Sequence, residues 1–348
     1  MTNSHLKSEI FEQPTTLRRL LDHETASIQR VASLIRERAP GYIMMVARGS
    51  SDNAARYGQY LFGAANGLPV ALAAPSLYTL YKKPPRLRDA LLLAVSQSGQ
   101  SPDIVTVMEE GRRQGVLTVA ITNDTESPLS GAVEHMVAMH AGREQSVAAT
   151  KTYTASLLAV AMLSAHLAGD HDRIRALEAI PDFVAQIIST FALSTIEAAE
   201  RYRYANACVV LSRGYNYATA FEVALKLKEL TYVLAEPYSS PDFEHGPVAL
   251  VEHGFPVIAV VPEGEVALEL VDYIRQLRDR GAELVVISAL DEALNLAQTP
   301  LPLPRRIPEW LSPIVAVIQG QLFALGLVLA KRYDPDHPRG IRKVTLTI

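Results

Sequence analysis

The 348-residue sequence contains only one cysteine, Cys208. A single cysteine cannot form an intramolecular disulfide, and no cysteine cluster is present that could hold zinc. Cys208 lies in the apolar run Ala207-Cys208-Val209-Val210-Leu211, which predicts a buried thiol rather than a reactive one. Freedom from disulfides is typical of a reducing compartment, so we expect a cytoplasmic protein.

The sequence also lacks an excess of charge of either sign. It has 33 basic and 37 acidic side chains, and its net charge is −4. This balance gives no reason to expect nucleic acid or an anionic membrane as a partner. An anionic ligand would therefore have to be bound by a local site.

Long uncharged stretches are rare. Residues 1–13 are polar and mixed in charge, which does not fit a signal peptide. Residues 311–330 are uncharged and about long enough to span a bilayer. They include Ser312, Pro313 and Gln319, and we find no second such stretch, so we predict a buried core helix here.

Short apolar segments alternate with helical patterns along the chain. The first series is a strand at 43–46, a helix at 50–63, a strand at 91–95, a turn at 96–99, a helix to about 115 and a strand at 116–122. Continuous apolar strands separated by helices are typical of a parallel sheet with helices on both faces. We therefore predict an α/β fold.

The same series recurs about 165 positions later. Arg48-Gly49 after the first strand matches Arg213-Gly214, and Gly99 after the second strand matches Gly264. Several features in register indicate a duplicated domain.

This duplication predicts the domain organisation. We expect an N-terminal helical segment at 1–29, a first domain at 30–170, a helical linker at 171–203 and a second domain at 204–348. The proline-rich residues 299–308 are predicted to form a loop.

The two copies differ after their second strand. The first copy has the hydroxyl-rich turn Ser96-Gln97-Ser98-Gly99-Gln100-Ser101, where the second has Val261-Pro262-Glu263-Gly264-Glu265. A turn between a strand end and a helix start suits a phosphate, because free N–H groups and the helix dipole point at it. Ser50 and Ser51, after the first strand, could bind the same anion. Alternatively, these serines only cap helices and fill turns.

The second copy contains a candidate catalytic helix, predicted from Tyr215 to about Leu234. Glu222, Lys226 and Glu229 stand at i, i+4 and i+7, so they share one helix face. The spacing alone also fits a solvent-exposed stripe with one ion pair. Because the surrounding residues are largely apolar, the charged stripe could instead be enclosed.

His245 is a further candidate. It precedes Gly246-Pro247, which predicts a loop, where binding and catalytic groups are often found. Histidine titrates near neutral pH and can donate or accept a proton.

Taken together, these residues resemble those of tandem sugar isomerase (SIS) domain proteins, in particular the isomerase half of the glucosamine-6-phosphate synthases. The resemblance extends from about residue 30 to residue 348. It is carried by the motifs Arg48-Gly49-Ser50-Ser51-Asp52-Asn53, Ser96-Gln97-Ser98-Gly99-Gln100-Ser101, Ser146-Val147-Ala148-Ala149-Thr150-Lys151, Ala224-Leu225-Lys226-Leu227-Lys228-Glu229 and Pro338-Arg339-Gly340-Ile341-Arg342-Lys343. It implies two tandem SIS domains, each a flavodoxin-like three-layer arrangement of a parallel sheet flanked by helices.

The resemblance also implies roles for individual residues. Glu229 would move a proton between C1 and C2 of the sugar, Lys226 would stabilise the enolate oxygen, and Glu222 would support them. His245, contributed by the neighbouring subunit of a homodimer, would open the sugar ring. Lys343 would close over the sugar, which Val147 and Arg342 would contact. The phosphate would be bound by Ser50, Ser51, Ser96, Gln97, Ser98 and Ser101.

The sequence departs from the synthases at several positions. They have a glutaminase domain with a cysteine directly after the initiator Met, whereas this chain has Thr2 there, so we do not expect it to take ammonia from glutamine. Gln100 and Ser101 replace Glu and Thr, Pro241 replaces Gly, and Glu244 replaces Lys. Gly340-Ile341-Arg342 replaces Asn-Leu-Ala in the tail. These changes resemble stand-alone deaminases and deglycases of the same superfamily.

We therefore expect an enzyme that converts glucosamine 6-phosphate and water into fructose 6-phosphate and ammonia, without metal or organic cofactor. Deglycation of a phosphorylated fructosamine, or isomerisation of galactosamine or tagatose phosphates, remains an alternative. A regulator that senses a sugar phosphate without turnover is an alternative of another class. The presence of Glu229, Lys226 and His245 favours an enzyme.

Overall fold

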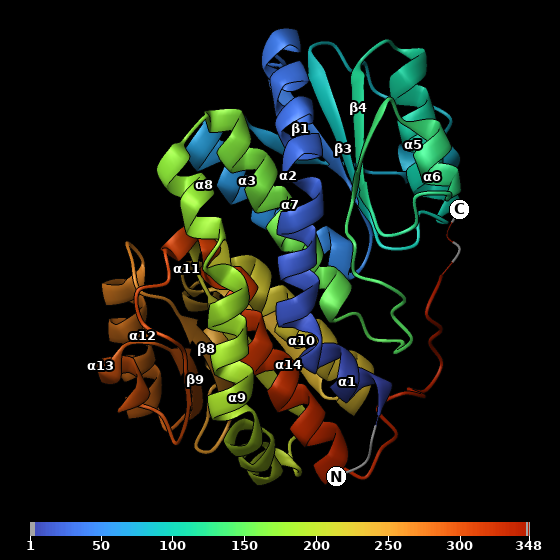
Figure 1. Ribbon diagram of the computed structural model, residues 1–348. Helices are drawn as coiled ribbons and strands as arrows, with labels where there is room; N and C mark the ends of the chain where they lie inside the picture. Colours follow the sequence, from blue (N-terminus) through green and yellow to red (C-terminus); the bar gives the residue numbers. More distant parts are fainter. Residues whose placement is uncertain (1–3, 346, 348) are drawn as a thin grey trace. The chain divides into compact units, whose positions relative to one another are not determined.

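The computed structural model describes residues 4–345 and residue 347. The chain forms two compact units (Figure 1). Within the described part, the N-terminal unit comprises residues 15–144, 151–179, 342–345 and 347. The C-terminal unit comprises residues 4–14, 145–150 and 180–341.

The N-terminal unit contains a five-stranded parallel sheet with the order β2-β1-β3-β4-β5. The strands are β1 (Tyr42–Val46), β2 (Val70–Leu72), β3 (Ala90–Ser96), β4 (Leu117–Thr122) and β5 (His135–Ala138). The helices are α2 (Gln13–Arg38), most of which belongs to this unit, α3 (Ser50–Asn66), α4 (Ser76–Thr79), α5 (Pro102–Arg113), α6 (Pro128–Ala132), α7 (Lys151–Ala168) and α8 (His171–Leu177).

The C-terminal unit contains a second five-stranded parallel sheet, with the order β10-β9-β8-β6-β7. Its strands are β6 (Ala207–Ser212), β7 (Leu234–Ser239), β8 (Pro256–Val261), β9 (Glu283–Ser288) and β10 (Thr299–Pro302). Its α-helices are α1 (His5–Phe11), α9 (Ile180–Ala198), α10 (Tyr217–Thr231), α11 (Ser240–Glu244), α12 (Ala267–Asp279), α13 (Asp291–Leu294) and α14 (Ser312–Ala330). Short 3-10 turns lie at Ala199–Tyr202, Gly214–Asn216, Pro247–Leu250 and Glu309–Leu311.

The two sheets have the same topology. Numbered along the chain within each unit, both read 2-1-3-4-5, the order of flavodoxin-like sheets. The predicted α/β class and the predicted duplication are therefore confirmed.

Each sheet is covered by helices on both faces, because its strands are apolar on both faces. In the N-terminal unit, α5 and α6 cover the face that carries Leu92, Ala94 and Ala120, and α3 packs with α7 (Figure 1). In the C-terminal unit, α12 and α13 cover the face that carries Val257 and Val286, and α14 packs with α9 and α10. Cys208 is buried in β6, as predicted, and burial raises the pKa of its thiol to about 12.

The long apolar helix α14 is a core helix, as predicted, since 89% of its apolar window is buried. The prediction that no second such stretch exists is wrong. A window within residues 171–202, which include α9, also has the length and hydropathy of a membrane span, and only 33% of it is buried. This segment is not an uncharged run, because α9 contains Asp182 and Glu197.

The prediction of a loop throughout residues 299–308 is also wrong. Residues Thr299–Pro302 form β10, which pairs in parallel with β9 at the edge of the sheet. Proline cannot donate to a strand ladder, so a strand with Pro300 and Pro302 is tolerated only at such an edge. The predicted catalytic helix also ends earlier than expected, because Tyr232 has a left-handed backbone with φ of 58°.

Candidate functional site

The hydroxyl-rich turn lies between β3 and α5 in the N-terminal unit. Its Gly99 has φ of +61°, and a Cβ at this position would lie 2.1 Å from Oγ of Ser127. Only glycine therefore fits this position of the turn. The N–H of Gly99 donates to Oγ of Ser96 (3.1 Å), and the N–H of Gln100 donates to Oγ of Ser98 (3.3 Å).

These bonds bear on the two interpretations of the serines. Ser96 and Ser98 do brace the turn, but a hydroxyl that accepts a hydrogen bond keeps its own proton for donation to a ligand. Ser101 is the N-cap residue of α5, yet its side chain makes no capping hydrogen bond. Capping therefore does not account for the hydroxyl of Ser101.

A second turn lies at the same edge of this sheet. Strands β1 and β3 are parallel neighbours, so the turns that follow them are adjacent. Ser50 and Ser51 form the first turn of α3, and both are partly buried. Nε of Arg48 lies 2.8 Å from a carboxylate oxygen of Asp103, which is fully buried at the start of α5. This ion pair ties the two turns together and places a cation beside them.

The equivalent turn of the C-terminal unit is built differently. The N–H of Glu265 donates to Oε2 of Glu309 (2.7 Å). A Cβ on Gly264 would lie 2.1 Å from the same oxygen. The space beside this turn is thus filled by a carboxylate of the protein itself, in agreement with the sequence difference between the copies.

The predicted catalytic residues lie on α10 in the C-terminal unit. The Lys226 side chain is 1% exposed, and its Nζ lies 3.4 Å from Glu222 and 2.6 Å from Glu229. Glu222 is fully buried, whereas 25% of the Glu229 side chain is exposed. The alternative of a solvent-exposed stripe is therefore wrong for Glu222 and Lys226. Removing charges from water is costly, so an enclosed cluster of this kind is a common feature of functional sites.

Other candidates of the C-terminal unit lie outside helix α10. His245 follows α11 as its C-cap residue, and its side chain is exposed. Among the described residues, the imidazole has neither an ion-pair nor a hydrogen-bond partner. Val147 is partly buried in the segment 145–150.

The C-terminal tail contributes to the N-terminal unit. Lys343 forms an ion pair with Glu144, which is buried. The Glu144 carboxylate also accepts hydrogen bonds from the backbone N–H (3.1 Å) and the hydroxyl (2.7 Å) of Thr152. Arg342 is exposed. Sequence reasoning missed Glu144, although it lies two residues before the motif that begins at Ser146.

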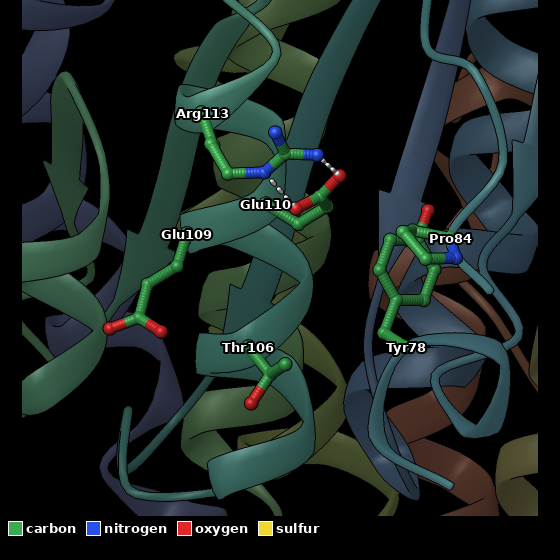
Figure 2. Close-up of a pocket in the computed structure, with 6 residues that line it drawn as sticks. All are labelled: Tyr78, Pro84, Thr106, Glu109, Glu110 and Arg113. Atoms are coloured by element: carbon green, nitrogen blue, oxygen red, sulfur yellow. Dashed lines mark hydrogen bonds and ion pairs between the residues drawn. The ribbon is translucent and has the colours of Figure 1, made fainter. Parts of the chain in front are cut away.

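A separate pocket of about 260 Å³ lies in the N-terminal unit, beside α4 and α5 (Figure 2). The residues that line it include none of the predicted site residues. Glu110 and Arg113 face each other there in a two-pronged ion pair, which lowers the pKa of Glu110. Burial raises the pKa of Tyr78 to about 12. Glu109 also lines the pocket and makes its net charge negative, so it is poorly suited to an anionic sugar phosphate.

Comparison with known proteins identifies the two halves. The SIS domain profile matches residues 38–165 and 202–329. The sequence is 31% identical over 353 residues to a glutamine–fructose-6-phosphate aminotransferase of Thermus thermophilus, covering 97% of this chain and 58% of that protein. A protein of the same name from Gloeobacter violaceus is 34% identical over 312 residues, covering 86% of this chain and 51% of that protein. The chain thus spans little more than half the length of these relatives.

Solved structures match almost the whole chain. A Silicibacter pomeroyi protein, provisionally assigned as a phosphosugar isomerase, superimposes with a TM-score of 0.86 and 36% identity, over 96% of this chain and 100% of the other. The C-terminal domain of glucosamine-fructose-6-phosphate aminotransferase from Francisella tularensis gives a TM-score of 0.86 and 26% identity, over 97% and 99%. Glucosamine-6-phosphate deaminase from Thermotoga maritima shares the fold, with a TM-score of 0.77 and 20% identity, over 99% and 100%.

Proposed function

Because the chain belongs to the SIS domain family, with one SIS domain in each half, we propose that it is a phosphosugar isomerase that also deaminates its substrate. The proposed reaction converts glucosamine 6-phosphate and water into fructose 6-phosphate and ammonia. The observation that carries this proposal is the buried ammonium of Lys226 between the carboxylates of Glu222 and Glu229.

The phosphate is the anchor of the proposed substrate. The hydroxyls of Ser50, Ser51, Ser96, Ser98 and Ser101 and the amide of Gln97 donate to its oxygens, and the positive end of the α5 helix dipole favours its charge. Binding energy from this unreactive group orients the reacting carbons. Val147, through its backbone, and Arg342 contact the sugar, and Lys343 closes over it.

Proton transfer is the central step. His245 of the partner subunit in a homodimer opens the sugar ring to the aldehyde. Glu229 takes the proton from C2 and returns it to C1, while Lys226 stabilises the negative charge that develops on O1. Glu229 suits this role because it is the more exposed carboxylate of the cluster, whereas the fully buried Glu222 supports Lys226. General-base catalysis typically contributes about 10²–10⁴-fold, and a preorganised cation at an oxyanion a similar factor.

Hydrolysis completes the reaction. The proton transfer leaves a ketimine at C2, and water adds to this carbon. The C2–N bond then breaks, ammonia leaves, and the oxygen of water becomes the ketone oxygen of fructose 6-phosphate. Each step is proton transfer or hydrolysis, so the proposed reaction requires no metal or organic cofactor. The single buried thiol fits a cytoplasmic enzyme.

The deaminase outcome rests on the departures from the synthase pattern at Gln100, Ser101, Pro241 and Glu244. It is tested by incubating the protein with glucosamine 6-phosphate, galactosamine 6-phosphate, a fructosamine phosphate and tagatose 6-phosphate, and measuring released ammonia and the sugar product. We expect ammonia and fructose 6-phosphate from the first substrate. Release of a free amino acid or amine from the fructosamine phosphate alone would instead identify a deglycase. Binding of the sugar phosphates without turnover would identify a sensor.

A further inference from the structure

The N-terminal helix α1 contacts the segment that contains Val147, and it does so through a buried carboxylate. Glu9 is 3% exposed. Its carboxylate accepts hydrogen bonds from the N–H of Ser146 (3.1 Å), from the hydroxyl of Ser146 and from the N–H of Gln145. Glu9 and these two residues all belong to the C-terminal unit.

Within the described part of the chain, all the hydrogen bonds to the Glu9 carboxylate come from one short segment, residues 145 and 146. Among the described residues, Glu9 has no ion-pair partner, so the charge of its carboxylate is balanced by the hydrogen bonds of residues 145 and 146. A buried carboxylate is costly unless it is fully hydrogen-bonded. The segment therefore has one strongly preferred position relative to Glu9. Hydrogen bonds to a charged group are also the stronger kind.

The remainder of the segment is braced as well. Oγ of Ser146 also lies 2.9 Å from the carbonyl oxygen of Ala148, on the far side of Val147, but its single proton can be donated to only one of Glu9 and Ala148 at a time. At the far end, the amide of Gln321 in α14 lies 3.5 Å from the carbonyl oxygen of Thr150. Gln13, directly after α1, donates to Gln321 (2.8 Å).

Helix α1 is itself fixed at its start. The carboxylate of Asp336 accepts hydrogen bonds from the N–H groups of His5 (2.8 Å) and Leu6 (2.9 Å). Oγ of Ser4 accepts from the N–H of Lys7 (3.2 Å). Asp336 lies shortly before the tail residues 342 and 343. Thus α1 is hydrogen-bonded both to the Val147 segment and to the root of the C-terminal tail.

We propose that Glu9 is a positioning residue that holds the Val147 backbone in place for the sugar, with α1 as its rigid support. This inference rests on the proposed function only in naming the sugar phosphate as the ligand. We call the hydrogen bonds that hold residues 145 and 146 against the Glu9 carboxylate the clamp. The clamp follows from the contacts of Glu9 alone.

The clamp is tested by E9Q, with E12Q as the control, because Glu12 is the next carboxylate along the chain and is exposed. In E9Q the amides of Gln145 and Ser146 should exchange with deuterium about tenfold faster than in wild type, since a neutral amide is a weaker acceptor and also carries donors. In E12Q their exchange should be unchanged. S146A, which removes only the hydroxyl donor, should show a smaller increase. If E9Q fails to fold, S146A is measured in its place. Unchanged exchange in a folded E9Q, or in S146A where E9Q does not fold, would overturn the clamp.

The positioning role has its own readout. In E9Q, or in S146A in its place, KM for glucosamine 6-phosphate should rise about tenfold, while inhibition by inorganic phosphate changes less than about twofold, because phosphate alone does not use the Val147 backbone. Parallel weakening of sugar phosphate and phosphate, or an unchanged KM, would overturn the role. If the wild-type protein neither binds nor converts any sugar phosphate, the proposed function fails, and deuterium exchange still decides the clamp.

Discussion

Nζ of Lys226 lies 2.6 Å from Oε2 of Glu229, and the lysine is almost fully buried while the carboxylate is partly exposed. Of the two side chains, the Glu229 carboxylate is therefore the one accessible to solvent or substrate. This is the arrangement that a general base requires when a cation must remain beside it in a protected position. Because the two residues lie three positions apart on one helix, helix geometry keeps their side chains on the same face.

The base assignment is tested by E229Q. We expect kcat to fall by at least about 10²-fold, because the amide cannot take a proton, while KM changes little. E236Q is the matched control, since Glu236 is paired with Lys228 at 3.9 Å and is about half exposed. It should retain wild-type kinetics. A wild-type kcat in E229Q would remove Glu229 as the base.

The phosphate assignment is tested by S98A. Loss of one hydrogen bond to a charged oxygen should raise KM about tenfold with little change in kcat. T106A is the control, because the Thr106 hydroxyl lies on α5, the helix that follows the turn, but donates to the carbonyl oxygen of Pro102 and lines the separate pocket (Figure 2). Equal KM values for S98A and wild type would place the phosphate elsewhere.

The turn itself is tested by G99A. A side chain at φ of +61° is strained, and its Cβ would meet Oγ of Ser127, so we expect a loss of about 2 kcal/mol or more in the free energy of unfolding. G63A in the interior of α3 meets nothing within 4 Å and should stabilise the protein by about 0.5–1 kcal/mol. Chemical denaturation measures both values, and similar stabilities for the two variants would contradict this account of the turn.

The shared site is tested by mixing. If His245 acts across a subunit boundary, inactive E229Q and H245A should recover activity once their subunits exchange. At equal amounts we expect about a quarter of the wild-type rate, because half of the dimers are mixed and each has one intact site. No recovery, with exchange demonstrated by mass spectrometry, would place both residues in the site of a single subunit.

The acid stability of the protein should depend on His166. Burial, and secondarily the charge of Arg36, lowers the pKa of His166 below its usual 6.5. As the pH falls through about 6.5, His166 becomes protonated in the unfolded state but stays neutral in the folded state. The free energy of unfolding therefore falls. H166Q removes this contribution and should lose less in Tm between pH 7.5 and 5 than wild type. H171Q, at an exposed position, should follow wild type, and equal losses in all three proteins would contradict the assignment.

The sequence predicted the repeated sheets well, because short apolar runs and glycine turns are local signals. Its errors occurred where tertiary context decides. Pro300 and Pro302 read as a loop, but an edge position lets them form a strand. The spacing of Glu222, Lys226 and Glu229 places them on one helix face but does not show what packs against that face, so it does not predict the burial of Lys226. The contact of Glu9 with Ser146 joins residues far apart in the chain, and nothing in either local sequence indicates it.

The account depends on one substrate using both sets of residues, and a crystal structure of E229Q with glucosamine 6-phosphate tests this most directly. We expect the phosphate within hydrogen-bonding distance of the Ser96, Ser98 and Ser101 hydroxyls, and C2 of the same sugar within about 3.5 Å of the side chain at position 229. A phosphate bound at these serines with its sugar directed away from position 229 in every subunit pairing would contradict the account.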